Sequence, residues 1–180
     1  MTDGTEIEQI DNFSKYTLLK ICMALELMHK NDLIHGDLKA SNILCDSYLG
    51  QIRVITKATA SSSAHLRDYS VLNTRGCPYW ITPELVNEPA DQGYTKEADV
   101  WAFGCLAYEL ATGRAPFTTT DATDETYSVL SEMRNSEHEP IPKALERANF
   151  ADLIESCLAK DPSDRPTMKE ILEHQFLLDA

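Results

Sequence analysis

The chain has 180 residues, of which 43% are hydrophobic, and a formal net charge of −13. This length suits one globular domain, and the apolar content supports a sizeable core and argues against global disorder. The acidic balance argues against non-specific binding to nucleic acid or to an anionic membrane surface, because both need a basic face.

The cysteines and the N-terminal residues indicate the cellular compartment of the protein. The five cysteines include no Cys-x-x-Cys pair, so they form neither a disulfide framework nor a zinc motif. Reduced thiols favour a cytoplasmic or nuclear protein, and no run of about 18 apolar residues predicts a transmembrane helix. Residues 1–13 are acidic and polar, which excludes a secretory signal and predicts a flexible segment.

The first predicted element is a helix over residues 14–30. Ser14 is placed to cap its start. Its apolar residues recur at spacings of three and four and therefore share one face: Leu18, Ile21, Cys22, Leu25 and Met28. A loop over residues 31–42 leads to a short β-hairpin, with strands predicted over 43–45 and 52–55.

A long loop and a buried helix follow the hairpin. Residues 56–94 lack helical periodicity and contain several glycines and prolines, which predicts a loop. Residues 95–112 are apolar on nearly all sides, which is typical of a central, buried helix. Gly113 stands where a left-handed C-terminal residue belongs. Asp99 falls in the first turn, where a buried carboxylate needs several hydrogen-bond donors.

Three further helices are predicted towards the C-terminus. One is polar and covers residues 121–135, one covers 144–159, and the last begins at Thr167. Thr167 and Glu170 have the spacing of a capping box. About five helices against two short strands predict a mainly α fold.

Asp37, Lys39 and Asn42 carry the clearest chemistry. In phosphoryl transfer the protein mainly positions groups and stabilises charge. An Asp can accept the proton of an attacking hydroxyl, a Lys two residues on can neutralise the phosphate, and an Asn three residues further can bind a metal ion. This spacing therefore favours a phosphoryl-transfer loop at residues 35–42.

Four segments occur together in a recognisable order: HGDLKASN at 35–42, GCPYWITPELV at 76–86, EADVWAFGCLAYELATGRAPF at 97–117 and CLAKDPSDRPTMKEILEHQFL at 157–177. They resemble the catalytic loop, the end of the activation loop, the central helix and the closing segment of the protein kinase family, nearest its serine/threonine branch. The resemblance implies one domain over 1–180 with the fold of the large C-terminal lobe. That fold has five to six helices and one or two short β-hairpins, with 56–94 as an activation-loop-like segment.

The resemblance implies a role for each matching residue. Asp37 would be the catalytic base, Lys39 the phosphate contact and Asn42 the metal ligand. A different interpretation keeps Asp37 and Asn42 only as hydrogen-bonding residues that shape the loop.

Other matching residues would be structural. Asp99 would accept backbone amides from around His35 and Gly36, and His35 is interpreted as a packing residue. Glu84 and Arg165 would form a buried ion pair that ties the end of the activation loop to the late helices. These residues indicate an intact fold and say nothing of catalysis.

The chain also departs from the family pattern. No Gly-x-Gly-x-x-Gly occurs in it, so the small N-terminal lobe with its phosphate-binding loop and lysine is expected to be absent. Thr56 stands where the magnesium-binding Asp of Asp-Phe-Gly is expected, so this cofactor-binding position is degenerate. Gly36 replaces the Arg before the catalytic Asp, and Cys77 replaces a Thr that would bridge Asp37 and Lys39.

Three hypotheses follow for function. The first is a pseudokinase-type scaffold or regulator that binds a protein partner, without nucleic acid, membrane or a bound metal. The groove below the Pro-Tyr-Trp segment and the helix near 121–135 are its candidate docking surfaces. The second is a serine/threonine kinase that uses ATP and magnesium and has its small lobe outside these residues. The third is a truncated product without a stable role.

Overall fold

The computed structural model describes residues 4–46, 50–56, 80–87, 94–117 and 148–178, and side chains from residue 12 onward. Within these ranges the chain is mostly helical, with one two-stranded antiparallel sheet. The predicted mainly α fold is confirmed at this level. The predicted helix over 121–135 and the docking surface assigned to it lie outside the described residues.

Helix α1 (Gly4–Lys30) begins ten residues before the predicted start at Ser14. The predicted start of the helix at Ser14 is therefore wrong. No glycine or proline interrupts residues 5–13, so the helical backbone continues towards the N-terminus. Ser14 is buried in the helix interior instead of capping it. Apolar periodicity reports only the part of a helix that packs against a core, and in the sequence that periodicity starts at Leu18.

The hairpin consists of β1 (Ile43–Asp46) and β2 (Gln51–Val54) and lies beside α1. Its register pairs Ile43 with Val54 and Asp46 with Gln51. The hydroxyl of Tyr16 on α1 donates to the carbonyl of Gly50 in the turn, at 2.9 Å. The two strands are close to those predicted. Their pairing places Ile55 and Thr56 directly after the strand that pairs with β1.

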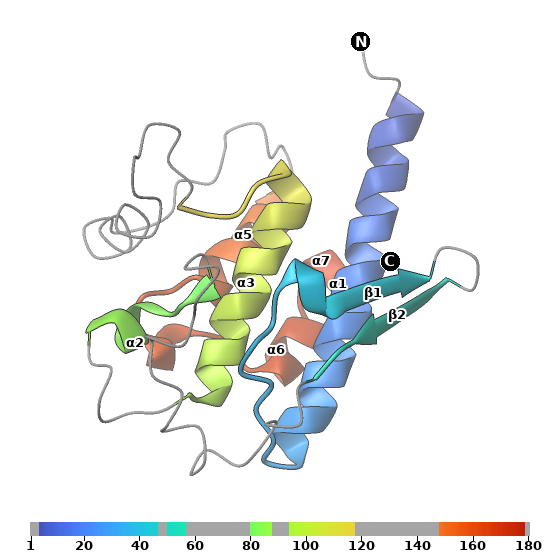
Figure 1. Cartoon of the computed structure of the whole chain (residues 1–180). Coiled ribbons are helices and arrows are strands. Elements are labelled where there is room, and N and C mark those ends of the chain that lie inside the picture. Colours follow the sequence, from blue (N-terminus) through green and yellow to red (C-terminus); the bar gives the residue numbers. More distant parts are fainter. Residues whose placement is uncertain (1–3, 47–49, 57–79, 88–93, 118–147, 179–180) are drawn as a thin grey trace, which may run out of the picture.

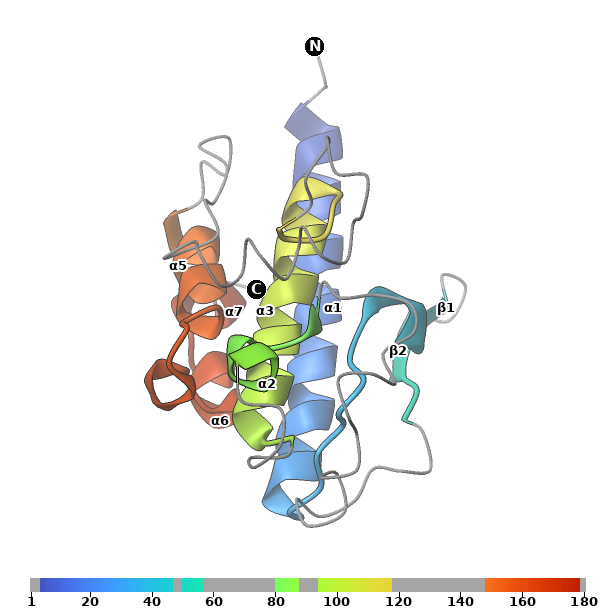
Figure 2. The same cartoon turned by 60° about the vertical axis from the view of Figure 1, so that its left-hand side comes forward.

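Helix α3 (Lys96–Thr112) runs through the centre of the molecule, beside α1 (Figures 1 and 2). Eleven consecutive residues, Ala98 to Tyr108, are buried, which confirms the central helix that the sequence predicts. Gly113 ends it with a φ of 74°, and its N–H donates to the carbonyl of Glu109. Thr95 precedes the helix in extended backbone, but its side chain makes no capping hydrogen bond.

Three helices from the end of the chain complete the core. Helix α5 (Ala148–Cys157) packs against α3, and α6 (Met168–Leu172) packs against α1. Helix α7 (Gln175–Leu178) contacts α5, where the rings of Phe150 and Phe176 stack with centroids 4.1 Å apart. The predicted capping box is present: Thr167 accepts from the N–H of Glu170, whose carboxylate accepts from the N–H of Thr167.

A short helix interrupts the segment that the sequence predicts as one long loop. Helix α2 (Pro83–Asn87) lies inside the activation-loop-like range 56–94, so the loop prediction is wrong for these residues. Five residues are too few to show helical periodicity in a sequence. Residues 57–79 and 88–93, including Cys77 and most of the Pro-Tyr-Trp segment, lie outside the described residues.

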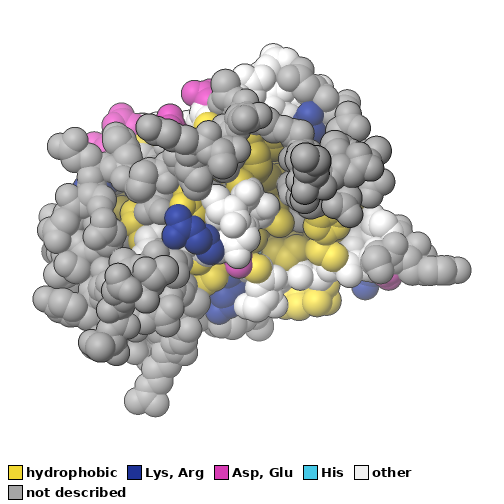
Figure 3. Space-filling model, turned by 90° about the horizontal axis from the view of Figure 1, so that it is seen from above, with side chains coloured by type: hydrophobic (Ala, Val, Ile, Leu, Met, Phe, Trp, Pro, Cys, Tyr) yellow, Lys and Arg dark blue, Asp and Glu magenta, His cyan; other side chains and the backbone are white. Residues whose placement is uncertain are grey.

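The described surface includes apolar side chains. Figure 3 shows hydrophobic groups gathered over part of the face seen from above. Large hydrophobic side chains that are exposed in the described residues are Phe13, Tyr16, Met23, Leu27, Leu33, Leu44, Ile55 and Leu178. None of the described helices is both long enough and apolar enough to cross a membrane.

Candidate functional site

The loop between α1 and β1 is fixed by one buried carboxylate. Asp99, in the first turn of α3, is fully buried. Its Oδ2 accepts from the backbone N–H of His35 at 2.8 Å, and its Oδ1 accepts from the N–H of Gly36 at 2.9 Å. These are the donors that the family resemblance implies for this carboxylate. Gly36 has a φ of 71°, a left-handed conformation that glycine adopts without strain.

A third donor to Asp99 comes from a residue that the sequence analysis missed. His29 lies in the last turn of α1, and its Nε2 is 2.9 Å from Oδ2 of Asp99. Nothing in the spacing of residues 29 and 99 indicates this contact. The one available signal was the need of a buried carboxylate for several donors. Three hydrogen bonds therefore join α1, the loop and α3 at Asp99.

His35 holds the other side of the loop. Its Nε2 is 3.1 Å from the carbonyl oxygen of Ile55, just after β2, and its Nδ1 accepts from the N–H of Asp37 at 3.3 Å. Both ring nitrogens are thus engaged with the backbone, and the residue is buried. This arrangement suits the packing role expected of His35.

Asp37, Lys39 and Asn42 lie together on this loop. The Nζ of Lys39 is 3.0 Å from Oδ1 of Asp37. The Nδ2 of Asn42 donates to the backbone carbonyl of Asp37 at 2.6 Å and to its Oδ2 at 3.0 Å. The side chains of Asp37 and Lys39 are 21% and 30% exposed, so a reacting group can approach them. The geometry suits a phosphoryl-transfer loop and also a purely loop-shaping role for Asn42.

The metal-binding side of the site is poor in ligands. The N–H of Ile55 donates to the carbonyl of Asn42 at 2.8 Å, and Thr56 follows directly, exposed to solvent. The resemblance expects a magnesium carboxylate at position 56, where this chain has a hydroxyl, and Mg²⁺ is usually bound through carboxylates together with phosphates. No group of three or more His, Cys, Asp or Glu side chains in the described ranges is placed to hold a metal ion. The described residues therefore fit a magnesium–nucleotide site only in part.

Glu84 on α2 and Arg165 before α6 form the predicted ion pair. Two guanidinium nitrogens donate to the two carboxylate oxygens at 2.9 and 2.8 Å. The Arg165 side chain is fully buried, and it also donates to three backbone carbonyls and lies 5.0 Å above the ring of Trp101. The pair connects the end of the activation-loop-like segment to the core.

Comparisons with known proteins point to one family. The model of the protein kinase domain matches residues 7–177. The chain is 32% identical to mitogen-activated protein kinase kinase kinase 3 of Arabidopsis thaliana over 88% of its own length. It is 33% identical to serine/threonine-protein kinase PLK2 of Mus musculus over 92%. Mitogen-activated protein kinase kinase kinase 19 of Homo sapiens is 29% identical over 92%.

The chain spans only 23% of the length of the first two relatives and 12% of the third. The similarity therefore concerns a domain of each relative and not the whole protein. Within that domain, the family match covers the catalytic-loop motif, the central helix and the closing segment that the sequence analysis singled out. The chain belongs to the protein kinase domain family.

Proposed function

We propose that these residues form a kinase-like large lobe with impaired phosphoryl transfer, which acts as a pseudokinase-type scaffold or regulator of a protein partner. Exposed Thr56, the second residue after β2, is the observation that carries this proposal. A neutral hydroxyl cannot supply the charge that a carboxylate gives to a divalent cation. The 180 residues also contain no glycine-rich phosphate loop, so they offer few groups to hold a nucleotide.

The preserved architecture supports a binding role. The contacts of Asp99 and the Glu84–Arg165 pair are those of an ordered lobe, and they do not depend on a nucleotide. Exposed apolar side chains such as that of Leu44, in strand β1 of the hairpin, offer area that a protein partner could cover. The four described cysteines are free thiols, which fits a cytoplasmic or nuclear setting.

Thermal unfolding with ATP, in the presence and absence of magnesium, tests this proposal. A ligand that binds the folded state raises the unfolding temperature. We expect no magnesium-dependent rise for the wild-type chain and a rise for Thr56→Asp, which supplies the carboxylate. Gln51→Asp adds the same charge at the far end of β2 and should behave as the wild type. A clear magnesium-dependent rise in the wild type would refute the proposal.

The second candidate is a serine/threonine kinase whose small lobe lies outside these residues. The convergence of Asp37, Lys39 and Asn42 favours it, with contacts of 2.6–3.0 Å. One relative is named as a serine/threonine-protein kinase. If the chain transfers phosphate to protein Ser or Thr, Asp37→Ala should abolish the transfer, whereas Asp164→Ala, exposed and remote on the surface, should not. Transfer that survives Asp37→Ala would exclude Asp37 as the base.

A further inference from the structure

Helix α1 carries an apolar stripe on the side that is turned away from the core. Its core-facing residues, such as Leu18 and Leu25, are fully buried and lie on the opposite side of the helix. The stripe consists of five side chains at alternating spacings of three and four residues: Phe13, Tyr16, Lys20, Met23 and Leu27. The four apolar ones are 42–65% exposed. This alternation is the spacing of the contact positions in a two-stranded coiled coil.

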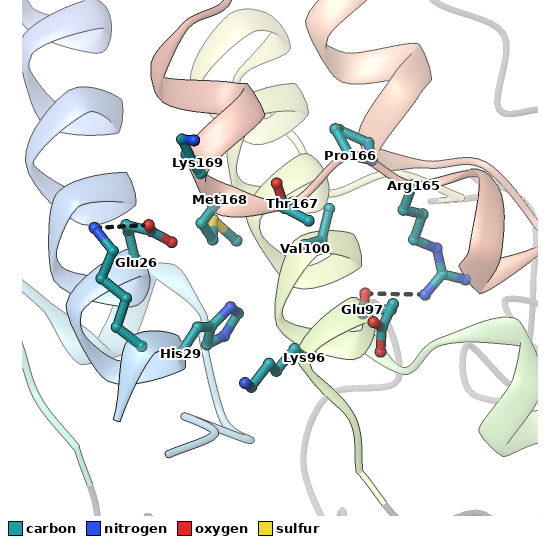
Figure 4. Close-up of a pocket in the computed structure, with 11 residues that line it drawn as sticks. Glu26, His29, Lys96, Glu97, Val100, Arg165, Pro166, Thr167, Met168 and Lys169 are labelled. Carbon is teal, nitrogen blue, oxygen red and sulfur yellow. Dashed lines mark hydrogen bonds and ion pairs between the residues drawn. The ribbon is translucent and has the colours of Figure 1, made fainter. Parts of the chain in front are cut away.

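The stripe is ordered and open to solvent. The hydroxyl of Tyr16 donates to the carbonyl of Gly50, which holds the ring in place. The Nζ of Lys20 lies 5.2 Å from the centroid of the same ring, so the lysine stem runs along the stripe. Figures 1 and 2 show the first turns of α1 extending beyond the other described helices. Glu26 and His29 line a cavity beside α3 (Figure 4), on a different side of α1 from the stripe.

The charges of α1 are divided along its length. Residues 4–13 contain three acidic side chains and no basic one, whereas residues 14–30 contain three lysines and one glutamate. Lys30 pairs with that glutamate, Glu26, at 3.0 Å, which leaves an excess of two lysines in the second half. Two copies of this helix side by side would bring like charges together if parallel and opposite charges together if antiparallel. The basic half of α1 therefore complements the acidic half of another copy.

An antiparallel pair centred at the level of Leu18 also matches the stripe to itself. Because a two-fold axis relates the two copies, residues equally distant from position 18 face one another. Phe13 would lie opposite Met23 of the other copy, and Tyr16 opposite Lys20. A thioether packs favourably against an aromatic ring, and an ammonium group against the face of one. A lysine within such a seam also selects one register.

We propose that α1 pairs with α1 of a second copy of this chain, as an antiparallel helix pair centred at the level of Leu18. The stripe supplies the contact area, and the divided charges set the orientation. From Phe13 to Leu27 the stripe is about 21 Å long, so the interface is small and the dimer forms only as the protein concentration rises. This surface is separate from the loop at residues 35–42, and the pairing does not depend on the proposed function.

Sedimentation equilibrium of the full chain over a range of concentrations tests the pairing. We expect the average mass to rise from that of one chain towards that of two. Met23→Glu should weaken the dimer by at least about tenfold, because a symmetric pair loses two buried methionine side chains. Leu27→Glu repeats the test at a more exposed position. Leu44→Glu adds the same charge in β1, outside the stripe, and should dimerise as the wild type does.

Two results would overturn the proposal. One is a wild-type chain that stays monomeric at every concentration, and the other is a dimer that survives both Met23→Glu and Leu27→Glu unchanged. Both replaced side chains are at least half exposed, so both variants should fold, and circular dichroism would check this.

A photo-reactive residue at position 13 tests the orientation. Benzoylphenylalanine would replace Phe13, and a mixture of ¹⁵N-labelled and unlabelled chains would be irradiated, so that mass spectrometry recognises cross-links between copies. Trypsin cleaves after Lys15, Lys20 and Lys30, which separates position 13 from Met23. We expect the cross-link in peptide 21–30 of the other copy. A cross-link to peptide 1–15 of the other copy would mean a parallel pair and would contradict the proposal.

Discussion

Arg165 shows how much of the fold can depend on one side chain. Its guanidinium is fully buried and donates to Glu84 and to the carbonyls of Ala159, Lys160 and Glu97. Nearly all of its donors are therefore satisfied, which removes most of the penalty of burying a charge. Removal of one partner leaves the other charge buried and alone.

Arg165→Met should lower the free energy of unfolding by about 3–5 kcal/mol, because it leaves Glu84 and three carbonyls without their donor. Urea denaturation would measure this loss. Lys96→Met breaks an ion pair between side chains that are 41% and 87% exposed, and it should cost less than about 1 kcal/mol. Similar losses in the two variants would contradict the importance given to the buried pair.

The carboxylate of Glu170 makes the stability contributed by the capping box depend on pH. The backbone N–H of Thr167 donates to its carboxylate, and this lowers the pKa of Glu170 below the ordinary value. The folded pKa is below the unfolded one, so the contribution to stability is present above the ordinary glutamate pKa. It is lost as the pH falls through the lowered value.

Glu170→Gln should remove this part of the acid dependence while it keeps the capping box, since Gln can also accept from the N-cap amide. Urea midpoints measured across the acidic range for both proteins would show it. The variant should lose less stability than the wild type as the pH falls. The same acid dependence in both proteins would contradict the role of Glu170.

At the scale of elements, α3 needs a glycine at two places for different reasons: Gly104 within the helix and Gly113 directly after it. A Cβ at Gly104 would lie 2.7 Å from the Cβ of Cys157 on α5, so this glycine allows the close approach of α3 and α5. A Cβ at Gly113 would meet nothing within 4 Å, but the backbone there has a φ of 74°. One glycine is required by space and the other by backbone conformation.

Gly104→Ala should destabilise the fold by about 1–3 kcal/mol through overpacking, which outweighs the gain in helix propensity. Gly113→Ala should cost about 1–2 kcal/mol through the left-handed backbone alone. Thermal and urea unfolding would measure both. A Gly104→Ala variant as stable as the wild type would mean that α3 and α5 do not pack as closely as described.

The sequence predicted best what short-range patterns determine. Gly113 and the Thr167–Glu170 box lie where their spacing indicates, since a cap depends on neighbours along the chain. The first ten residues of α1 and the short helix α2 were missed, because neither sequence shows apolar residues at helical spacing over enough positions.

In the candidate site, too, contacts between residues close in the sequence were predictable, and contacts between distant residues were not predictable from spacing. The loop residues Asp37, Lys39 and Asn42 were predictable because they lie within six positions of one another. The contact of Asp99 with the loop amides was expected from a family resemblance, since 63 and 64 positions separate the partners. The contact of His29 with Asp99 could not be predicted, because a lone histidine at a helix end carries no pattern.

On the scale of the whole molecule, membership of the protein kinase domain family does not by itself decide whether the chain transfers phosphate. The match to the protein kinase domain covers residues 7–177, and the contacts that order the loop and the central helix are present. Position 56, where the family resemblance expects a carboxylate, nevertheless holds an exposed threonine. The packing contacts are compatible with both proposed functions, and the proposal of impaired phosphoryl transfer depends on the residue at position 56.

Calorimetric titration of ATP into the chain, with excess magnesium and with a chelator, tests this central claim most directly. The account predicts the same weak binding in both conditions, because no carboxylate at Thr56 recruits the cation. Magnesium that tightens ATP binding tenfold or more, about 1.4 kcal/mol, would contradict it.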